Sequence, residues 1–232
     1  MLRLLVAEGN TCDGRCRIAE SAGATPAESY ADVLRLIAPD AQVDIFTPAD
    51  EGATLPAPLD AYDGIATGSF LNIYRREAAS LRQIDFVREV FARAIPMFGI
   101  LLGLQLAMVA AGGEVAPNPR GREVAFARQI ILTEAGRSHA MHHRRAAAFD
   151  APAIHRDVVM RLPQGATVIA WNAMSEVRAA EIRLGDCVFW GAQYHPEYRL
   201  HDIAAVVRRC GEILVIDGFL RGSQNLSVTP RI

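Results

Sequence analysis

The chain has 232 residues, which is enough for one α/β domain that buries a large core without disulfide or metal cross-links. Apolar residues make up 51% of it. The formal net charge of −2, without any block of Lys and Arg, gives no electrostatic basis for binding nucleic acid. The four cysteines have no paired CxxC spacing, so we expect reduced thiols rather than disulfides or a zinc site.

The beginning of the chain gives no sign of export or membrane insertion. The apolar run over residues 1–7 is too short for a secretion signal, and no run reaches the roughly 18 apolar residues that a membrane helix needs. We therefore expect a cytoplasmic protein without membrane contact. One domain is expected over residues 1–232, with residues 224–232 as a flexible tail.

The first half alternates short apolar runs with segments of helical periodicity. This pattern predicts strands at residues 3–7, 43–46, 64–66 and 96–100, and helices at residues 27–37, 78–94 and 105–111. Between the first strand and the first helix, Cys12 and Cys16 are expected in a polar loop.

The second half, after Pro117 and Pro119, has shorter predicted strands. They fall at residues 125–132, 166–171, 177–182 and 187–193, and a last helix is predicted at residues 201–214. The alternation of strands and helices predicts an α/β fold with a doubly wound, mostly parallel sheet flanked by helices. Because ligands of such folds bind beyond the carboxyl ends of the strands, residues that follow two such ends are expected at one cleft.

One of these junctions has the framework of a nucleophile turn without a nucleophile. Residues 98–105 have the sequence Phe-Gly-Ile-Leu-Leu-Gly-Leu-Gln, in which an apolar strand enters a helix through Gly-x-x-x-Gly. The residue at the apex of this turn is Leu101. Further on, Gln-Tyr-His-Pro-Glu over residues 193–197 places His195 two residues before Glu197, which is typical of a general base and the acid that orients it.

Together these motifs resemble the class I glutamine amidotransferases, in which a Gly-x-Cys-x-Gly-His-Gln turn and a distant His-Pro-Glu form a Cys-His-Glu triad. Residues 63–69 stand where the oxyanion loop of that family would be. The resemblance implies a flavodoxin-like fold without cofactor or metal. It implies catalytic positions at Leu101, His195 and Glu197, and oxyanion or substrate contacts at Gly68, Ser69, Leu102, Gln105 and Tyr194.

The same resemblance implies that cysteine chemistry is absent, because Leu101 occupies the nucleophile position and Leu104 replaces the His before Gln105. Hydrolysis of this type carries the acyl group on a thiolate, and a leucine side chain has no lone pair. Loss of a triad nucleophile costs on the order of 10⁴ to 10⁶ in turnover. The family's nucleophile also sits in a strained backbone, at a cost of about 1–3 kcal/mol. We expect such strain at Leu101 and an apolar pocket floor.

Replacement nucleophiles are weaker candidates. Ser69 is expected to form backbone hydrogen bonds in its Gly-rich turn, and Cys187 is expected in the core. A loop thiol at Cys12 or Cys16 that reaches His195 is disfavoured but open.

Two histidine-containing segments in the second half have ordinary interpretations. Residues 142–145, His-His-Arg-Arg, are expected to form a solvated basic patch rather than a metal site. His155-Arg156-Asp157 is expected either at the edge of the cleft or with its last two residues as a surface ion pair.

We therefore expect a class I glutamine amidotransferase-like protein that does not hydrolyse glutamine through a thioester and has been repurposed to bind a small molecule or a partner protein. One alternative is a hydrolase or lyase that uses His195 and Glu197 on another small substrate. The other is an ordinary amidotransferase with a substitution at Leu101. A synthase or another protein, or a second copy of the chain in a homodimer, stays open as a partner. An open polar pocket would favour an enzyme, and a pocket filled by Leu101 and Leu104 a binding role.

Overall fold

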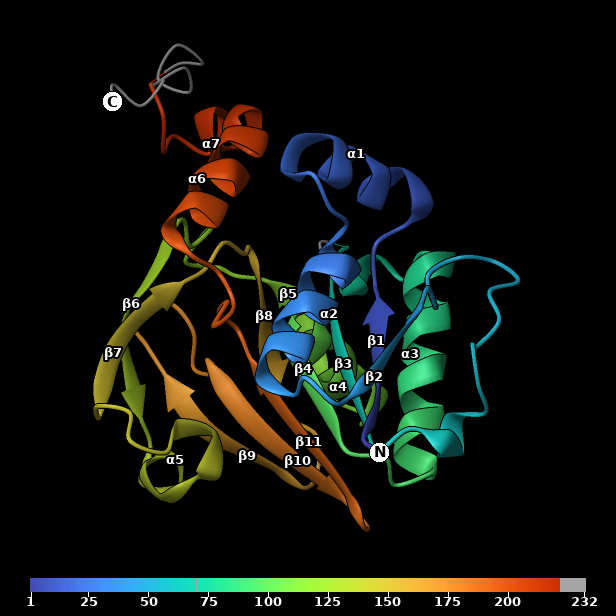
Figure 1. Ribbon diagram of the computed structural model, residues 1–232. Helices are drawn as coiled ribbons and strands as arrows, with labels where there is room; N and C mark the ends of the chain where they lie inside the picture. Colours follow the sequence, from blue (N-terminus) through green and yellow to red (C-terminus); the bar gives the residue numbers. More distant parts are fainter. Residues whose placement is uncertain (70, 222–232) are drawn as a thin grey trace.

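The computed structural model describes residues 1–69 and 71–221 and shows a mixed β-sheet with helices on both faces (Figure 1). None of the described helices combines the length and apolarity needed to cross a bilayer. The expected tail at residues 224–232 lies outside the described residues. The helices are α1 (Cys12–Ala22), α2 (Pro26–Ile37), α3 (Ala78–Ala92), α4 (Leu102–Ala110), α5 (Glu134–Ser138), α6 (Leu200–Arg209) and α7 (Gly211–Ile216). The strands are β1 (Arg3–Glu8), β2 (Gln42–Phe46), β3 (Gly64–Ser69), β4 (Met97–Leu101), β5 (Glu114–Pro117), β6 (Phe126–Leu132), β7 (Ala148–Pro152), β8 (Asp157–Arg161), β9 (Ala166–Trp171), β10 (Ala179–Leu184) and β11 (Cys187–Ala192).

The large sheet changes character half-way across. Its strand order is β2-β1-β3-β4-β11-β10-β9-β6-β7. The pairs from β2 to β11 are parallel, and those from β11 to β7 are antiparallel. The predicted doubly wound α/β fold is confirmed, but its parallel pairing is confined to the half that contains β1, β3 and β4. The strands β5 and β8 form a separate antiparallel pair.

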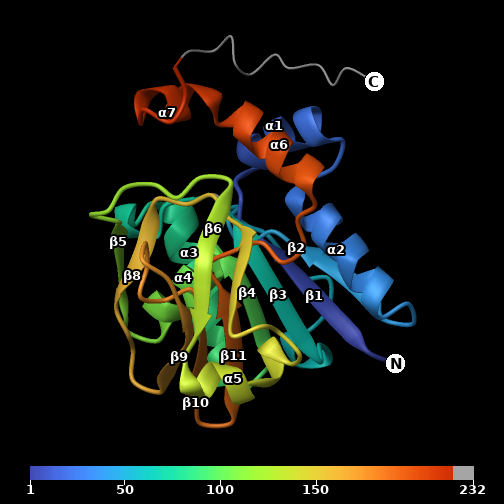
Figure 2. The same cartoon turned by 90° about the vertical axis from the view of Figure 1, so that its left-hand side faces the viewer.

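Parallel pairing brings the carboxyl ends of β1, β3, β4 and β11 to one edge of the sheet. On one face, α3 and α4 pack over β3 and β4 around the main core. On the other face, α2 packs against β1 and β2 through Ala27 and Ala31. Both views place α1 and α6 together beyond the carboxyl edge (Figures 1 and 2). The edge is therefore walled by helices on two sides.

Two glycines allow α4 to lie directly against the sheet. A Cβ on Gly99 would be 2.5 Å from the carbonyl carbon of Gly103, and a Cβ on Gly103 would overlap the carbonyl oxygen of Thr67. No side chain fits in either space, because protein interiors are already close-packed. The Gly-x-x-x-Gly spacing therefore determines how closely the helix approaches β3 and β4.

The segment after β1 is a helix, so the expectation of a polar loop at Cys12 and Cys16 is wrong. Thr11 caps α1 by accepting a hydrogen bond from the backbone N–H of Gly14, and Gly23 ends the helix with a φ of 83°. Because α1 contains few apolar residues, its periodicity is hard to detect in the sequence.

At the other end of the chain, the predicted helix over residues 201–214 is two helices, α6 and α7, that meet at Cys210. The short strands β5, β7 and β8 and the short helix α5 were not predicted, and the periodicity of such short segments is weak.

Replacing Gly99 by alanine tests the close approach of α4. We expect Gly99→Ala to reduce the free energy of unfolding by about 3 kcal/mol, because its Cβ meets backbone atoms that cannot rotate away. The matched control is Gly64→Ala in β3, whose Cβ would be 3.4 Å from a flexible Leu4 side-chain atom and should cost about 1 kcal/mol or less. Urea unfolding measures both, and equal losses would contradict this explanation.

Candidate functional site

Leu101 forms a sharp turn between β4 and α4. It is the last residue of the strand, and its φ of 49° and ψ of −104° lie in a region that residues with a side chain rarely adopt. The side chain is 4% exposed. A strand-to-helix turn of this kind raises one side chain above the sheet edge. Here the raised side chain is apolar.

His195 and Glu197 form a close pair three residues after the end of β11. The backbone N–H of His195 donates to the carbonyl oxygen of Pro152 at 2.8 Å, and Nδ1 of its ring is 2.7 Å from Oε1 of Glu197. The ring of Tyr198 stacks on the imidazole with 3.8 Å between centroids and 3° between planes. The carboxylate and the stacked ring together fix the orientation of the imidazole.

This pairing leaves the other ring nitrogen available as a base. With the proton on Nδ1 donated to Glu197, Nε2 of His195 carries a lone pair. Both Nε2 of His195 and Oε2 of Glu197 are buried and have no hydrogen-bond partner among the described residues. A carboxylate on one ring nitrogen and a lone pair on the other are what a general base requires.

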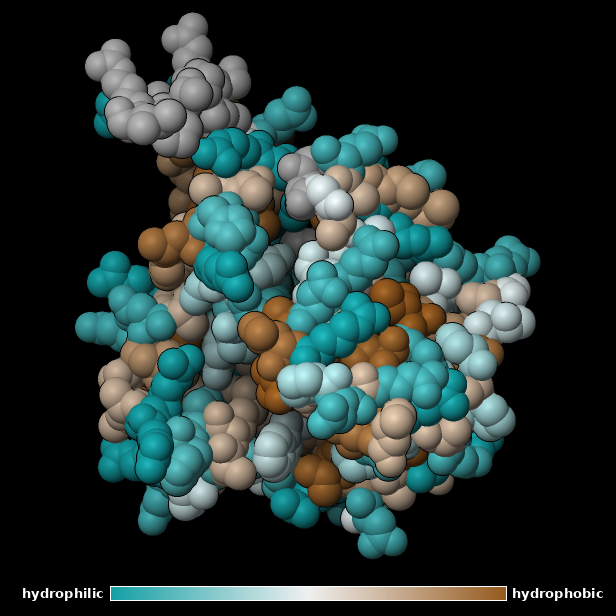
Figure 3. All heavy atoms as spheres, in the orientation of Figure 1, coloured by the Kyte–Doolittle hydropathy of each residue, from teal (hydrophilic) through white to brown (hydrophobic). Residues whose placement is uncertain are grey.

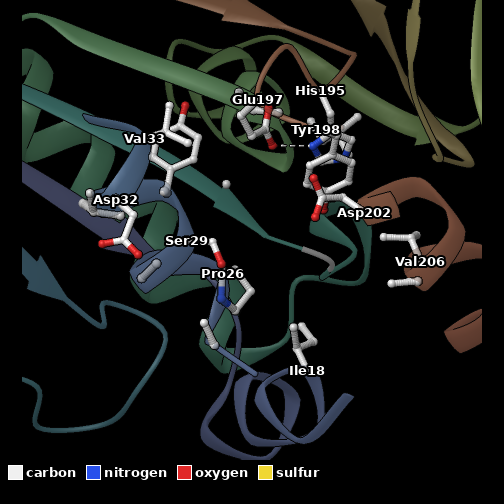
Figure 4. Close-up of a pocket in the computed structure, with 18 of the residues that line it drawn as sticks. Ile18, Pro26, Ser29, Asp32, Val33, His195, Glu197, Tyr198, Asp202 and Val206 are labelled. Carbon is white, nitrogen blue, oxygen red and sulfur yellow. Dashed lines mark hydrogen bonds and ion pairs between the residues drawn. The ribbon is translucent and has the colours of Figure 1, made fainter. Parts of the chain in front are cut away.

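A cavity of about 560 Å³ adjoins these groups at the carboxyl edge of the sheet. Its lining includes Gly68 from β3, Leu101 from β4, and both His195 and Glu197. Figure 4 shows Ile18, Pro26, Ser29 and Val33 on the walls opposite the His195 and Glu197 pair. Most of these walls come from α1, α2 and α6, so the cavity lies between those helices and the sheet edge.

Leu102, Gln105 and Tyr194 are not on the described lining of this cavity. Leu102 is buried as the first residue of α4. Gln105 is buried and its Nε2 donates to the carbonyl oxygen of Asp157 at 3.1 Å. The Tyr194 hydroxyl is 3.0 Å from Nε2 of His142. The backbone of Ser69 pairs with Leu101 in the β3–β4 ladder, and its side chain is not among those described. Of the predicted contact set, Gly68 alone lies with Leu101 and the His195–Glu197 pair on the described lining of this cavity.

The sequence analysis missed several residues of the cavity lining, and three of them contact the site or its wall through polar or aromatic groups. Glu8 ends β1 and is buried; its carboxylate accepts hydrogen bonds from the side chain of Asn10 at 2.6 Å and from the backbone N–H of Ala27 at 2.8 Å. Tyr30 projects from α2, and Tyr198 covers the imidazole. Tyr198 directly follows the His-Pro-Glu motif and was detectable from the sequence, whereas Glu8 and Tyr30 have no motif.

The family model for glutamine amidotransferase class-I matches residues 41–209. This match spans the turn at Leu101 and the pair of His195 and Glu197. The chain belongs to the class I glutamine amidotransferase family. The resemblance that the sequence motifs indicated is therefore confirmed.

Sequence relatives of this amidotransferase-family chain include amide hydrolases and synthases. A gamma-glutamyl-L-1-hydroxyisopropylamide hydrolase from a Pseudomonas species is 42% identical over 221 residues, covering 94% of this chain and 75% of that protein. Gamma-glutamyl peptidase 4 of Arabidopsis thaliana is 26% identical, covering 72% of this chain and 66% of that protein. A glutamine-hydrolyzing GMP synthase of Nitrosomonas eutropha is 34% identical over 140 residues, and the matched part is 25% of its length. The family thus includes proteins in which such a domain accompanies a synthase.

Solved structures of glutamine amidotransferases have the same fold. The glutamine amidotransferase of Thermotoga maritima superposes with a TM-score of 0.70 at 17% identity, covering 97% of this chain and 90% of that one. A glutamine amidotransferase of Methylobacillus flagellatus gives a TM-score of 0.66 at 20% identity, covering 91% of this chain and 76% of that one. These likenesses support the amidotransferase fold of the chain.

A buried ionic cluster supports α4 of this amidotransferase fold from behind. Arg178 is completely buried, and its Nη1 is 2.6 Å from Oε2 of Glu123. Nδ1 of His155 is 3.1 Å from the same Asp157 carbonyl oxygen that accepts from Gln105. Burial alone would raise the pKa of Glu123, but its hydrogen bond with His155 and the charge of Arg178 keep this pKa below its ordinary value. The cluster therefore links α4 to the antiparallel half of the sheet.

The interpretation of Arg156 and Asp157 as a surface ion pair is wrong. Arg156 is exposed, but the side chain of Asp157 is buried, and burial raises its pKa. Only tertiary packing places this carboxylate beneath the surface, since its sequence neighbours are those of an ordinary polar turn.

The expectation of a solvated basic patch at residues 142–145 is wrong for His142. His142 is 3% exposed and packs near Phe149 and Tyr194, whereas the next three residues are exposed. Burial first, and then the charge of nearby His139 and Arg145, lowers the pKa of His142 to about 4. Burial raises the pKa of Tyr194 to about 12. Both groups are neutral at pH 7, so their hydrogen bond is one between neutral partners.

The lowered pKa of His142 predicts a specific acid sensitivity. A histidine with a pKa of about 4 in the folded chain and about 6.5 in the unfolded chain contributes its full stability above pH 6.5 and loses it as the pH falls toward 4. Between pH 7 and 4.5 we expect wild type to lose about 2 kcal/mol more unfolding free energy than His142→Gln, which does not titrate. Urea unfolding at both pH values measures this difference. Parallel losses in the two proteins would show that His142 is not the titrating group.

Proposed function

We propose that this chain binds a γ-glutamyl amide in the cavity beside His195 and does not hydrolyse it through a thioester. One observation carries the proposal: Leu101 occupies the apex of a strained nucleophile-type turn and lines the same cavity as the oriented His195 and Glu197. The binding framework and the base are thus in place, while the apex offers no lone pair.

The open cavity supports ligand binding. It has about 560 Å³ of space, with Leu101 in its wall, and Leu104 is completely buried in the main core. The two leucines therefore do not fill it. The choice of ligand is based on sequence similarity. The Pseudomonas relative, which is 42% identical over 94% of this chain, is named as a hydrolase of a γ-glutamyl amide.

The positions of the cysteines support the loss of covalent chemistry. Cys12 and Cys16 are exposed on α1, and the cavity's described lining contains no cysteine. The Cys187 thiol is buried, donates to the carbonyl oxygen of Ile95 at 3.4 Å, and has a pKa raised by burial. A thiol that must stay protonated in the core is a poor nucleophile.

Hydroxyl groups do not replace the missing thiol in this arrangement. Ser29 lies on the wall opposite the His195 and Glu197 pair (Figure 4). Nε2 of His195 has no hydrogen-bond partner among the described residues, so no described hydroxyl is positioned for deprotonation.

Introducing a thiol at the apex tests the proposal. We expect wild type to bind γ-glutamylmethylamide by calorimetry but to release no glutamate or methylamine. Leu101→Cys should hydrolyse the same amide, with a gain on the order of 10⁴ over wild type, because the nucleophile then has its base in place.

The control for this experiment is the double variant Leu101→Cys with His195→Ala, which keeps the thiol but loses the base and should stay inactive. Turnover by wild type at a rate similar to that of Leu101→Cys would overturn the proposal. Absence of amide binding to folded wild-type protein would overturn it as well.

A second candidate function is hydrolysis by water that His195 activates directly. The observation that favours it is the buried Nε2 of an imidazole that Glu197 and Tyr198 hold in place, without a hydrogen-bond partner in the described part of the chain. A base in this state can remove a proton from water beside a bound substrate without a covalent intermediate.

The two candidates are separated by single substitutions in the wild-type background. Direct water activation predicts slow wild-type hydrolysis of γ-glutamylmethylamide that His195→Ala reduces by a factor on the order of 10² or more, while Leu101→Ala leaves it within a few-fold. Glutamate release, measured over hours, is the readout. Equal rates in wild type and His195→Ala would exclude this second function.

A further inference from the structure

We infer that the side of the cavity formed by α2 receives the N-alkyl group of the γ-glutamyl amide. This side of the cavity favours amides of apolar amines over γ-glutamyl amino acids. This inference rests on the proposed function and adds the chemistry of one subsite. It depends on three features: the apolar wall along α2, the bonding of the cavity's acidic residues, and one carboxylate oxygen without a partner among the described residues.

The first feature is a continuous apolar surface that starts at the His195 and Glu197 pair. A second cavity of about 510 Å³ lies between α2 and the sheet, and its lining includes Leu4, Leu34, Met97 and Val188. Both cavities are lined by Tyr30, Val33, Ile100 and Glu197, so they adjoin along the inner side of α2.

The surface view agrees with this placement. Figure 3 shows apolar atoms on both sides of the polar outer stripe of α2. The exposed apolar residues at its end are Leu36 and Ile37, which are 75% and 74% exposed and also contribute to the cavity linings. An N-alkyl group that extends from the site toward α2 therefore enters an apolar environment.

The second feature is that most acidic residues of the cavity already have partners within the protein. Glu8 accepts from Asn10 and from the backbone N–H of Ala27. Asp32 pairs with Arg35 at 2.9 Å. Asp202 accepts from the backbone N–H of Arg199 at 2.7 Å and is 3.0 Å from Nε2 of His201. Glu8 and Asp202 thus accept hydrogen bonds at the first turns of α2 and α6, and Asp32 pairs within α2, so each has a partner without a ligand.

The third feature is the carboxylate of Glu197, a residue that lines both cavities; its Oε2 is buried and has no hydrogen-bond partner in the described ranges 1–69 and 71–221. A buried carboxylate oxygen is costly unless it accepts a hydrogen bond, so a ligand N–H at this point is favoured. Burial, and after it the negative charge of Glu197, raises the pKa of the Tyr30 hydroxyl well above its ordinary value. That hydroxyl is therefore neutral. A ligand carboxylate placed here would face the negative charge of Glu197, and the neutral hydroxyl of Tyr30 would not compensate it.

Two arginines line the first cavity: Arg199, which precedes α6, and Arg209 at the end of α6. Arg199 is exposed and Arg209 is half-buried, and neither is on the described lining of the second cavity next to α2. His195 is engaged by Glu197. The wall along α2 therefore combines apolar side chains with one buried acceptor, which suits an amide N–H followed by a hydrocarbon group.

The test uses two ligands of the same shape and opposite character on the wild-type protein. γ-Glutamylisobutylamide and γ-glutamylglycine share the γ-glutamyl group and place either two methyl groups or a carboxylate at the same position. We expect calorimetry to show binding of the isobutylamide at least about tenfold tighter. Along the methyl, ethyl and propyl amides, each added carbon should tighten binding about fourfold.

Paired valine substitutions locate the subsite. Val33→Thr places a hydroxyl group in the apolar wall and should weaken isobutylamide binding about fivefold while leaving γ-glutamylglycine unchanged within about twofold. The matched control is Val43→Thr in β2, which is also half-buried, belongs to the apolar cluster between α2 and the sheet, and is on the described lining of neither cavity; it should change neither affinity. Circular dichroism confirms that both variants fold.

The outcomes separate this inference from the proposed function. If both ligands bind with equal affinity, or if Val33→Thr weakens both equally, the amide binds but the subsite assignment is wrong. If neither ligand binds to folded protein, the proposed function itself fails. Preference for the isobutylamide that Val33→Thr removes and Val43→Thr retains is the supporting result.

Discussion

The turn that carries Leu101 depends on how closely α4 can approach the sheet. Gly99 and Gly103 leave no room for a side chain between helix and strands, so the chain has to turn sharply at Leu101, the middle one of the three residues between them. Leu101 takes a backbone conformation with a φ of 49° for that reason. The strain, about 1–3 kcal/mol for such a residue, is offset by the core that α4 forms with α3 and the parallel strands. The turn is thus a consequence of backbone packing and does not need a catalytic side chain at its apex.

The base side of the site is held by different forces. A carboxylate on Nδ1 and the stacked ring of Tyr198 fix the imidazole of His195, and the backbone N–H of His195 is tied to β7. Behind α4, the buried cluster of Glu123, His155 and Arg178 joins the helix to the antiparallel half of the sheet. The two halves of the sheet therefore meet at the site, and the contacts named on its base side do not include the Leu101 side chain.

The cavity beside His195 is defined by the helices around it and by the apolar residues along α2. Synthase relatives and amide hydrolases both match this sequence, but the space beside His195 in this chain is bounded by α1, α2 and α6 and is apolar along α2. Burial makes each unpaired polar atom on that boundary expensive, so the few that lack a partner among the described residues, such as Oε2 of Glu197, are informative about the ligand. Specificity in such a site follows from what the wall excludes as much as from what it contacts.

The sequence by itself determined the family, the α/β fold and the positions of Leu101, His195 and Glu197, because strand periodicity, glycine spacing and the His-Pro-Glu motif are local signals. It did not determine α1, whose sparse apolar residues give little periodicity, or the antiparallel half of the sheet, whose pairing joins segments far apart in the chain. Only the tertiary structure decided that Gln105 and Tyr194 turn to internal partners, that His142 and Asp157 are buried, and that Glu8 and Tyr30 reach the cavity. Burial and hydrogen-bond partners depend on which elements pack together, and no neighbouring residues in the sequence encode them.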